Sequence, residues 1–334
     1  MLDYLQQLFN EIPQPMRESI LLIFPLFNSQ HRFYWFYMLG FLVLIMGITL
    51  TQEFKHTPVS VKKFLACCFP QSVYSHKSAI LDYQYYLVNG ILKIAISSSV
   101  IISLSEIIAR WIYSGLYLIF GQPETQLEIT FIVSLIYTII AAVVADLGYY
   151  LAHSLLHRIP ALWEFHKIHH SAEVLTPVTG FREHLLDSTL IYIFKAACLG
   201  PILGIFSYIF SSGVETINVG NLNIVVFLFQ FSINFRHSHI WLPYNWYLSH
   251  VLSSPAMHCI HHSQTSIHFN KNFGLIFSLW DYLFETIYVP REREEFTVGL
   301  SEETYSSLQD MYYRPFGRSL KITTSNKLQG ESEP

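Results

Sequence analysis

Long apolar stretches, separated by shorter polar segments, dominate the pattern of this chain. A helix that crosses a bilayer needs about 20 predominantly apolar residues. Five stretches have this character: 33–50, 85–105, 129–145, 189–210 and 217–235. The first and third carry no charge, the second and fourth carry one lysine each, and the fifth is uncharged but holds several asparagines. The pattern predicts an all-α integral membrane protein with about four to five transmembrane helices.

The segments between these stretches indicate three parts. Segment 17–32 is too short to span and contains Pro25, so residues 1–70 are predicted to form an interfacial helix followed by the first span. Residues 71–290 hold the other spans and every cluster of histidines. Residues 291–334 are rich in charges of both signs, which is typical of a solvated tail.

Composition narrows the class of protein. Hydrophobic residues make up 51% of the chain, charged residues 13%, and the mean hydropathy is +0.34, as in membrane proteins. The net charge of −4 gives no support for nucleic-acid binding. The four cysteines lack C-x-x-C spacing, so neither a disulfide framework nor a zinc ribbon is predicted.

Histidines are concentrated in one window. Thirteen of the sixteen lie between positions 153 and 268. Eight form three clusters, which are His153 and His157, then His166, His169 and His170, then His258, His261 and His262. Residues at i, i+3 and i+4 share a helix face, so each cluster can aim several imidazoles at one point. Because buried neutral rings need partners and protonated rings repel one another, the spacing favours a polynuclear metal site.

Helix lengths predict that the clusters meet on one side of the membrane. A helix over 129–157 would measure about 43 Å against a hydrocarbon core of about 30 Å, so the first cluster would emerge beyond Tyr149 and Tyr150. Pro160 ends this helix before the second cluster, and Pro255 opens the helix of the third. If this side is cytoplasmic, fifteen of the twenty Lys and Arg lie inside, which predicts a cytoplasmic site.

The ligand type narrows the metal. Imidazoles suit zinc, copper, iron or nickel, and eight or more exceed the coordination of one ion. Structural zinc is usually closed by four ligands that often include cysteine, and no H-E-x-x-H motif is present. Two redox-active irons that activate O2 therefore fit best.

Three further histidines and one carboxylate stand near the clusters. His184 follows the second cluster closely and His237 lies where the last apolar stretch ends, so both are predicted ligands. His239 is an open case between a ligand and a support for one. Asp146 lies two helical turns before His153, so it is predicted to accept a hydrogen bond from a ligand histidine.

These residues also resemble the membrane fatty acid hydroxylase and sterol desaturase superfamily. The resemblance covers about residues 70–290, in matching order and spacing. Its elements are Asp146 with Tyr149 and Tyr150, His153-x3-His157, Pro160-Ala-Leu-Trp163-x-Phe165-His166-x-x-His169-His170-Ser171, Phe181-Arg182-x-His184, His237 before Leu242-Pro243, Pro255-x-x-His258-x-x-His261-His262, Asn272-Phe273-Gly274 and Trp280-Asp281-x-x-Phe284.

The resemblance implies a non-haem di-iron oxidoreductase that uses O2 to hydroxylate or desaturate a C–H bond of a membrane lipid, whether fatty acyl, sterol or alkyl-ether. The eight clustered histidines with His184 and His237 would hold two Fe ions, and Asp146, Asn272 and Asp281 would support the chemistry. No electron-donor domain is recognisable, so an external electron donor is expected as a separate redox partner.

Two alternatives stay open. One is a membrane metal transporter, although transporters place polar ligands near the bilayer midplane whereas these clusters flank the spans. The other is a zinc-dependent membrane hydrolase, which metal analysis and an oxygen-consumption assay would distinguish.

Overall fold

The computed structural model of the chain describes residues 33–54, 60–123, 127–210, 214–219, 222–301 and 305–330. The interfacial helix predicted for 17–32 lies outside these ranges. Within them, the only strands are β1 (Asn218–Val219) and β2 (Leu222–Asn223), which form an antiparallel hairpin. The helices, in chain order, are α3 (Trp35–Glu53), α4 (Val61–Cys68), α5 (Gln71–Tyr74), α6 (Lys77–Phe120), α7 (Phe131–Arg158), α8 (Pro160–His170), η2 (Thr179–Phe181), α9 (Leu185–Ile209), α10 (Ile224–Arg236), α11 (Trp246–Ser249), α12 (Pro255–His261), η3 (Ser266–His268), α13 (Leu279–Leu283) and α14 (Leu308–Gly330).

Most of the predicted spans are present as helices. Among the described residues, α3, α7 and α9 are long and apolar enough to cross a membrane. The predicted span 85–105 lies inside α6, a continuous helix of 44 residues. The fifth predicted span is wrong in length, because α10 has only 13 residues, about 20 Å. The side chain of Asn223 accepts hydrogen bonds from the first backbone N–H groups of α10, so the helix begins there rather than at 217.

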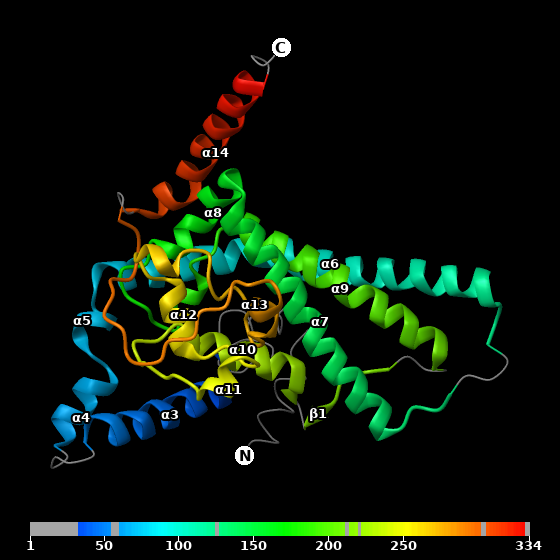
Figure 1. The fold of residues 1–334 in the computed structure, drawn as a ribbon, viewed down its shortest axis with the longest axis horizontal. Helices are drawn as coiled ribbons and strands as arrows, with labels where there is room; N and C mark the ends of the chain where they lie inside the picture. The colour runs from blue at the N-terminus through cyan, green and yellow to red at the C-terminus, as the bar shows by residue number, and fades with distance from the viewer. Residues whose placement is uncertain are drawn as a thin grey trace, which may run out of the picture.

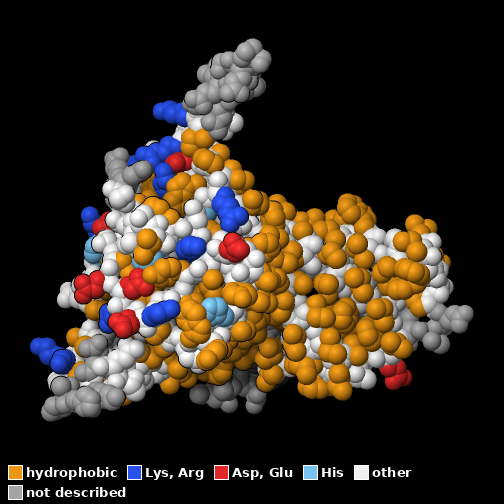
Figure 2. Space-filling model, in the orientation of Figure 1, with side chains coloured by type: hydrophobic (Ala, Val, Ile, Leu, Met, Phe, Trp, Pro, Cys, Tyr) orange, Lys and Arg blue, Asp and Glu red, His pale blue; other side chains and the backbone are white. Residues whose placement is uncertain are grey.

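α6, α7 and α9 lie together and form an apolar half of the molecule (Figure 1). α6 and α9 approach closely where α9 has glycine. A Cβ atom at Gly200 would lie 2.6 Å from Cβ of Ile108, and one at Gly204 would lie 2.6 Å from the Ala109 carbonyl oxygen. Small residues allow such close packing of membrane helices. On the face shown in Figure 2, this half carries almost only hydrophobic side chains, whereas the charged side chains gather on the other half.

The other half, here called the polar cap, contains the short helices that follow α7 and α10. α7 ends at Arg158, just before Pro160, and Pro255 lies in the first turn of α12, both as predicted; Pro160 itself lies in the first turn of α8. α14 packs on α8, and its far end projects away from the cap (Figure 1).

A buried ion pair fixes α8 to α6. Arg182 donates through Nη1 to Oδ1 of Asp82 at 2.6 Å, and both residues are about 1% exposed. The same guanidinium donates through Nε to the Ile168 carbonyl at 2.9 Å and through Nη2 to the Ser171 hydroxyl at 2.8 Å. One arginine therefore ties the C-terminal end of α8 to α6.

Candidate metal centre

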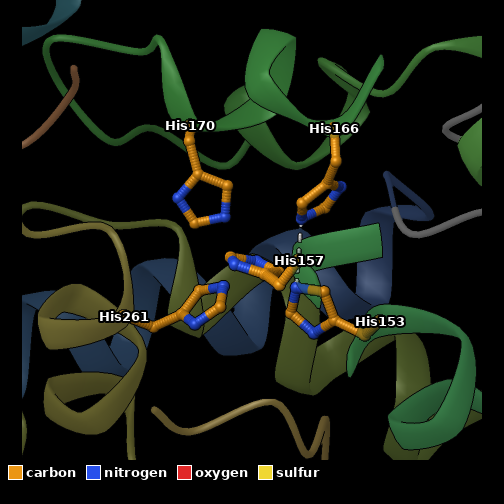
Figure 3. Close-up of side chains that lie close together, drawn as sticks. All are labelled: His153, His157, His166, His170 and His261. Atoms are coloured by element: carbon orange, nitrogen blue, oxygen red, sulfur yellow. Dashed lines mark hydrogen bonds between the residues drawn. The ribbon is translucent and has the colours of Figure 1, made fainter. Parts of the chain in front are cut away.

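Nine of the ten predicted ligand histidines converge in two adjacent groups where α7 meets the polar cap. Within each group, one ligand atom per residue lies within 4.8 Å of the others. Group A consists of His153, His157, His166, His170 and His261. Group B consists of His169, His237, His258 and His262. Figure 3 shows the five rings of group A gathered around one point, from α7, α8 and α12.

One rule of helix geometry sorts the histidines between the groups. Each pair at i and i+4 enters the same group: His153 with His157, His166 with His170, and His258 with His262. The intervening residue at i+3 enters the other group. It is His169 in α8 and His261 in α12. On a helix, the side chain at i+3 lies to one side of the side chain at i, and the side chain at i+4 lies to the other side. Each His-x-x-His-His run therefore serves both groups.

The two groups therefore share α8 and α12, and they touch. The rings of His170 in group A and His262 in group B stack with centroids 4.5 Å apart. His237 directly follows α10 and lies 2.9 Å, between Nε2 atoms, from His258. Ligands from segments far apart in the sequence thus meet in a single two-part centre.

The donor atoms fit two metal ions. Nε2 of His258 lies 2.9 Å from Nε2 of His237 and 3.1 Å from Nε2 of His262. A single N–H can satisfy only one such contact, whereas nitrogens bound to one ion at about 2.0–2.1 Å lie roughly 3–4 Å apart. In group A, the buried Nε2 atoms of His157, His170 and His261 have no hydrogen-bond partner among the described residues (a bound ion would satisfy them).

Burial keeps these imidazoles in the neutral form that binds metals. Eight of the nine histidines are at most 5% exposed. Burial lowers the pKa of five of them in the polar cap well below the ordinary 6.5, namely His169, His170, His258, His261 and His262. The pKa of His261 falls to about 3.

Backbone carbonyls orient several rings from behind. Nδ1 of His153 donates to the Phe273 carbonyl at 2.8 Å, and Nδ1 of His261 donates to the Lys271 carbonyl at 2.7 Å. Such outer contacts fix the tautomer and orientation of a ligand histidine. The loop at 271–273 therefore positions two members of group A.

Charged side chains contact two further ligand rings. Nδ1 of His166 lies 3.3 Å from Oδ2 of the buried Asp187. In group B, Nη2 of Arg236 lies 2.5 Å from Nδ1 of His258, and Nη1 donates to the Leu275 carbonyl at 2.8 Å.

Asn272 and Asp281 support this loop and do not contact the ligand nitrogens. The amide nitrogen of Asn272 donates to the Met257 and Tyr288 carbonyls at 3.0 and 2.9 Å. Asp281 accepts from the backbone N–H groups of Phe273 and Gly274 at 2.7 and 2.8 Å. Burial raises the pKa of Asp281 to about 6. We therefore reassign both residues from a catalytic role to a supporting one.

Asp146 also departs from its predicted role. Its carboxylate accepts from the backbone N–H groups of Ile276 and Phe277 at 2.8 and 3.1 Å instead of from a ligand histidine. Each of its two oxygens accepts one of these bonds. Asp146 thus anchors the chain beyond Leu275 to α7, and Asp187 is the carboxylate beside a ligand.

Two predicted or open histidines lie outside both groups. His184 caps α9, where its Nδ1 accepts from the Leu186 N–H at 3.1 Å and its ring packs against Phe165. His239 lies with Nε2 3.2 Å from the Cys67 carbonyl. The structure does not bring either residue to the centre, so we remove His184 from the ligand set.

The sequence reasoning undervalued two features of the site. Asp187 is one of several carboxylates near the clusters in the sequence, and its place in the first turn of α9 is the signal that distinguishes it. The carbonyl acceptors at 271–273 carry no side-chain signal. Only the Asn272-Phe273-Gly274 motif marked that loop.

Comparison with known proteins agrees with this geometry. Residues 138–286 match the model of the fatty acid hydroxylase family, and this range contains every histidine of groups A and B. This match confirms the resemblance to that family which the motifs predicted.

Similar proteins of known name share about a quarter of the matched residues. An ornithine lipid hydroxylase of Rhizobium tropici is 27% identical over 187 residues, 54% of this chain and 50% of that protein. The alkylglycerol monooxygenase of Xenopus tropicalis is 27% identical over 159 residues, 47% of this chain and 31% of that protein. A very-long-chain aldehyde decarbonylase of Oryza sativa subsp. japonica is 27% identical over 149 residues, 42% of this chain and 21% of that protein. The chain spans half or less of the length of these relatives, and no solved structure is significantly similar.

Proposed function

We propose that this protein is an O2-dependent di-iron oxidoreductase that hydroxylates or desaturates a C–H bond of a membrane lipid. The observation that carries the proposal is the convergence of nine histidines, eight of them buried, into two touching groups. Nitrogen-rich sites of this kind suit redox-active iron, and the donor set holds no thiolate. The names of the relatives, a lipid hydroxylase and an alkylglycerol monooxygenase, favour hydroxylation.

Each part of the centre has a proposed role. The nine histidines hold two Fe ions, which when bound would supply the activation of O2 and the oxidation of the lipid. The carbonyls of Lys271 and Phe273 and the carboxylate of Asp187 hold three ligand rings in place, and the guanidinium of Arg236 lies against the ring of His258. The chain thus contributes ligand orientation before the reaction begins.

Aromatic side chains exclude water from group A. The Phe273 ring is fully buried and lies 5.0 Å from the ring of His157. The Trp163 ring lies 5.0 Å from the same histidine, and the Tyr149 ring lies 5.3 Å from the ring of His153. A dry site prevents side reactions of an oxidising centre and strengthens its electrostatic interactions.

The membrane supplies the substrate in this proposal. His153 and His157 lie in the last turns of α7, whose other residues are apolar enough to span. A fatty acyl, sterol or alkyl-ether lipid can reach the centre from the apolar half without entering water. Fifteen of the twenty Lys and Arg lie on the predicted inner side, which supports a multi-pass protein with a cytoplasmic site.

Two further parts of the proposal concern organisation. Residues 71–290 act as the catalytic domain, with residues 1–70 as an N-terminal membrane segment and residues 291–334 as a tail. Because oxygenation consumes two electrons from outside the site, a separate redox partner delivers them.

The deciding experiment measures metal and lipid products together. We expect about two irons per purified chain, and a lipid that gains one oxygen or loses two hydrogens in air but not under argon. His169→Ala should abolish product formation and lower the iron content. The control His250→Ala, outside both groups, should leave both quantities unchanged. Zinc with hydrolysis products in both atmospheres would establish the hydrolase alternative, and metal uptake into vesicles without lipid oxidation would establish the transporter.

A further inference from the structure

Lys195 is a charged residue of α9 that belongs to neither group of the metal centre. It lies ten residues inside a helix that is long and apolar enough to span a membrane. Within the described part of the chain, its ammonium group has no ion-pair or hydrogen-bond acceptor, and it lies 4.0 Å from the centroid of the Phe229 ring. Because an ionisable residue in a spanning segment is costly, it marks a functional site by default.

The position of Lys195 connects it to group A. A Cβ atom at Gly148 of α7 would lie 2.7 Å from Cα of Lys195, so the two helix backbones touch there. Gly148 precedes His153 by five residues, which is about 7.5 Å along the helix axis. Phe229 and Tyr149 belong to the same apolar cluster, and the Tyr149 ring contacts His153. The lysine therefore lies on the apolar side of group A, about one and a half helical turns from a ligand.

Among the described residues, no carboxylate forms an ion pair or a hydrogen bond with this ammonium group. The carboxylates of Asp146 and Glu183 act on Lys195 only through space, and the oxygens of Asp146 accept from the Ile276 and Phe277 N–H groups. Phe229 offers only the face of its ring, which attracts a cation more weakly than an anion does. An anionic oxygen group would complete the surroundings of the lysine.

We propose that Lys195 binds the anionic group, a carboxylate or a phosphate, of the lipid substrate and so fixes which carbon lies at group A. This inference rests on the proposed oxidation of a membrane lipid. A charge-assisted hydrogen bond is strong in apolar surroundings, so one lysine can hold the polar end of a lipid. Lys195 contacts α7 at a point about 7.5 Å along the helix axis from His153. The oxidised carbon of the lipid therefore lies near its anionic group and not at the far end of its hydrocarbon chain.

The test compares matched probes with the iron-loaded full chain in nanodiscs of neutral lipid. Methyl palmitate replaces the carboxylate of palmitic acid with a neutral methyl ester, and a diacylglycerol lacks the phosphate of the corresponding phosphatidic acid. Lys195→Met removes the charge at similar length, Lys195→Arg keeps it, and Phe229→Leu removes only the ring. Lys195→Gln replaces the methionine variant if that protein unfolds in detergent.

We expect Lys195→Met to raise KM about tenfold for the anionic probe that the enzyme accepts, and to leave KM for the neutral partner unchanged. The product should also spread over several carbons, a change that a purely structural role would not cause. Lys195→Arg should keep both the KM for the anionic probe and the product position of the wild-type protein. In metal-free protein, the amount of anionic lipid that co-purifies, measured by mass spectrometry, should fall in the methionine variant, which tests binding without activity.

An unchanged product position with equal KM values in Lys195→Met would overturn the proposal. Phe229→Leu with the same effects as Lys195→Met would also overturn it, because the lysine would then serve packing alone. If the wild-type protein oxidises no lipid, the proposed function fails, and the lipid retained by metal-free protein still decides whether Lys195 binds anions. Preference for the carboxylate or for the phosphate pair identifies which anion it binds.

Discussion

Groups A and B of the metal centre differ in where their ligands come from. Group A takes two of its five histidines from α7, a helix that is long and apolar enough to cross a membrane. Group B takes its four from α8, from α12 with the residue after it, and from His237 after α10. The geometry of group A therefore depends on how a membrane helix meets the polar cap. Group B depends on the cap and the end of one short helix, and it has one donor fewer.

The largest expected difference between the groups is their tolerance of a lost ligand. His237→Ala leaves group B with three histidines, whereas His157→Ala leaves group A with four. We expect His237→Ala to reduce the metal content to about one ion per chain and to abolish lipid oxidation. His157→Ala should keep about two ions, because group A would then still have as many nitrogen donors as intact group B. Metal analysis of the two purified variants checks this difference. Equal loss of metal from both variants would show that the fifth donor of group A does not preserve metal binding.

Removal of the metals should make stability depend on pH. Burial lowers the pKa of five cap histidines below 6.5, three in group B and two in group A. The unfolded chain therefore binds more protons than the folded chain below pH 6.5, and the free energy of unfolding falls on acidification. Each histidine contributes at most about 1.4 kcal/mol per pH unit, and all five at most about 7 kcal/mol.

Unfolding of metal-free and metal-loaded protein in detergent, at pH values of about 7.5 and 5.5, measures this effect. Metal-loaded protein should lose its stability at a lower pH, because bound ions compete with protons for the same nitrogens. Metal-free protein that is equally stable at both pH values would contradict the neutral state of the buried rings.

Arg182 should affect both groups equally, since it holds the end of the helix they share. Arg182→Met leaves Asp82 as a buried, unpaired carboxylate, which costs about 3–5 kcal/mol of the free energy of unfolding. Both metals should then be lost over the same temperature range. The control Arg314→Met breaks an Asp310 pair on α14 that is partly exposed, so it should cost at most about 1 kcal/mol. Loss of one metal before the other in Arg182→Met would show that α8 does not couple the groups.

Local spacing in the sequence predicted much of the fold and the centre. The i and i+4 pairs and the two prolines that open α8 and α12 act within a few residues, so their consequences could be inferred without a fold. The spacing did not predict the division of the His-x-x-His-His runs. Each cluster was expected to aim at one point, whereas His169 and His261 enter a different group from their neighbours.

Contacts between distant segments could not be inferred in this way. Asp146 bonds to Ile276, 130 residues away, and so does not reach a ligand. His184 has the right neighbours in sequence, yet it caps the helix that it precedes. The fifth predicted span was too long because the side chain of Asn223 caps α10, so the helix begins later than the apolar stretch does. Hydropathy does not detect such a cap.

The smallest expected difference between the groups concerns Asp187, which contacts a ligand ring of group A only. Asp187→Ala removes the acceptor beside His166, which should weaken metal binding in group A by about 10- to 100-fold and leave group B unchanged. Asp187→Asn keeps an acceptor oxygen and should lose less, and Asp310→Ala on α14 is the control for a lost carboxylate far from the centre. Competition with a chelator should then release the two metals in separate steps, the group A metal first. Release in a single step would mean that the groups hold their ions as one unit, because a weakened ligand on one side would then loosen both.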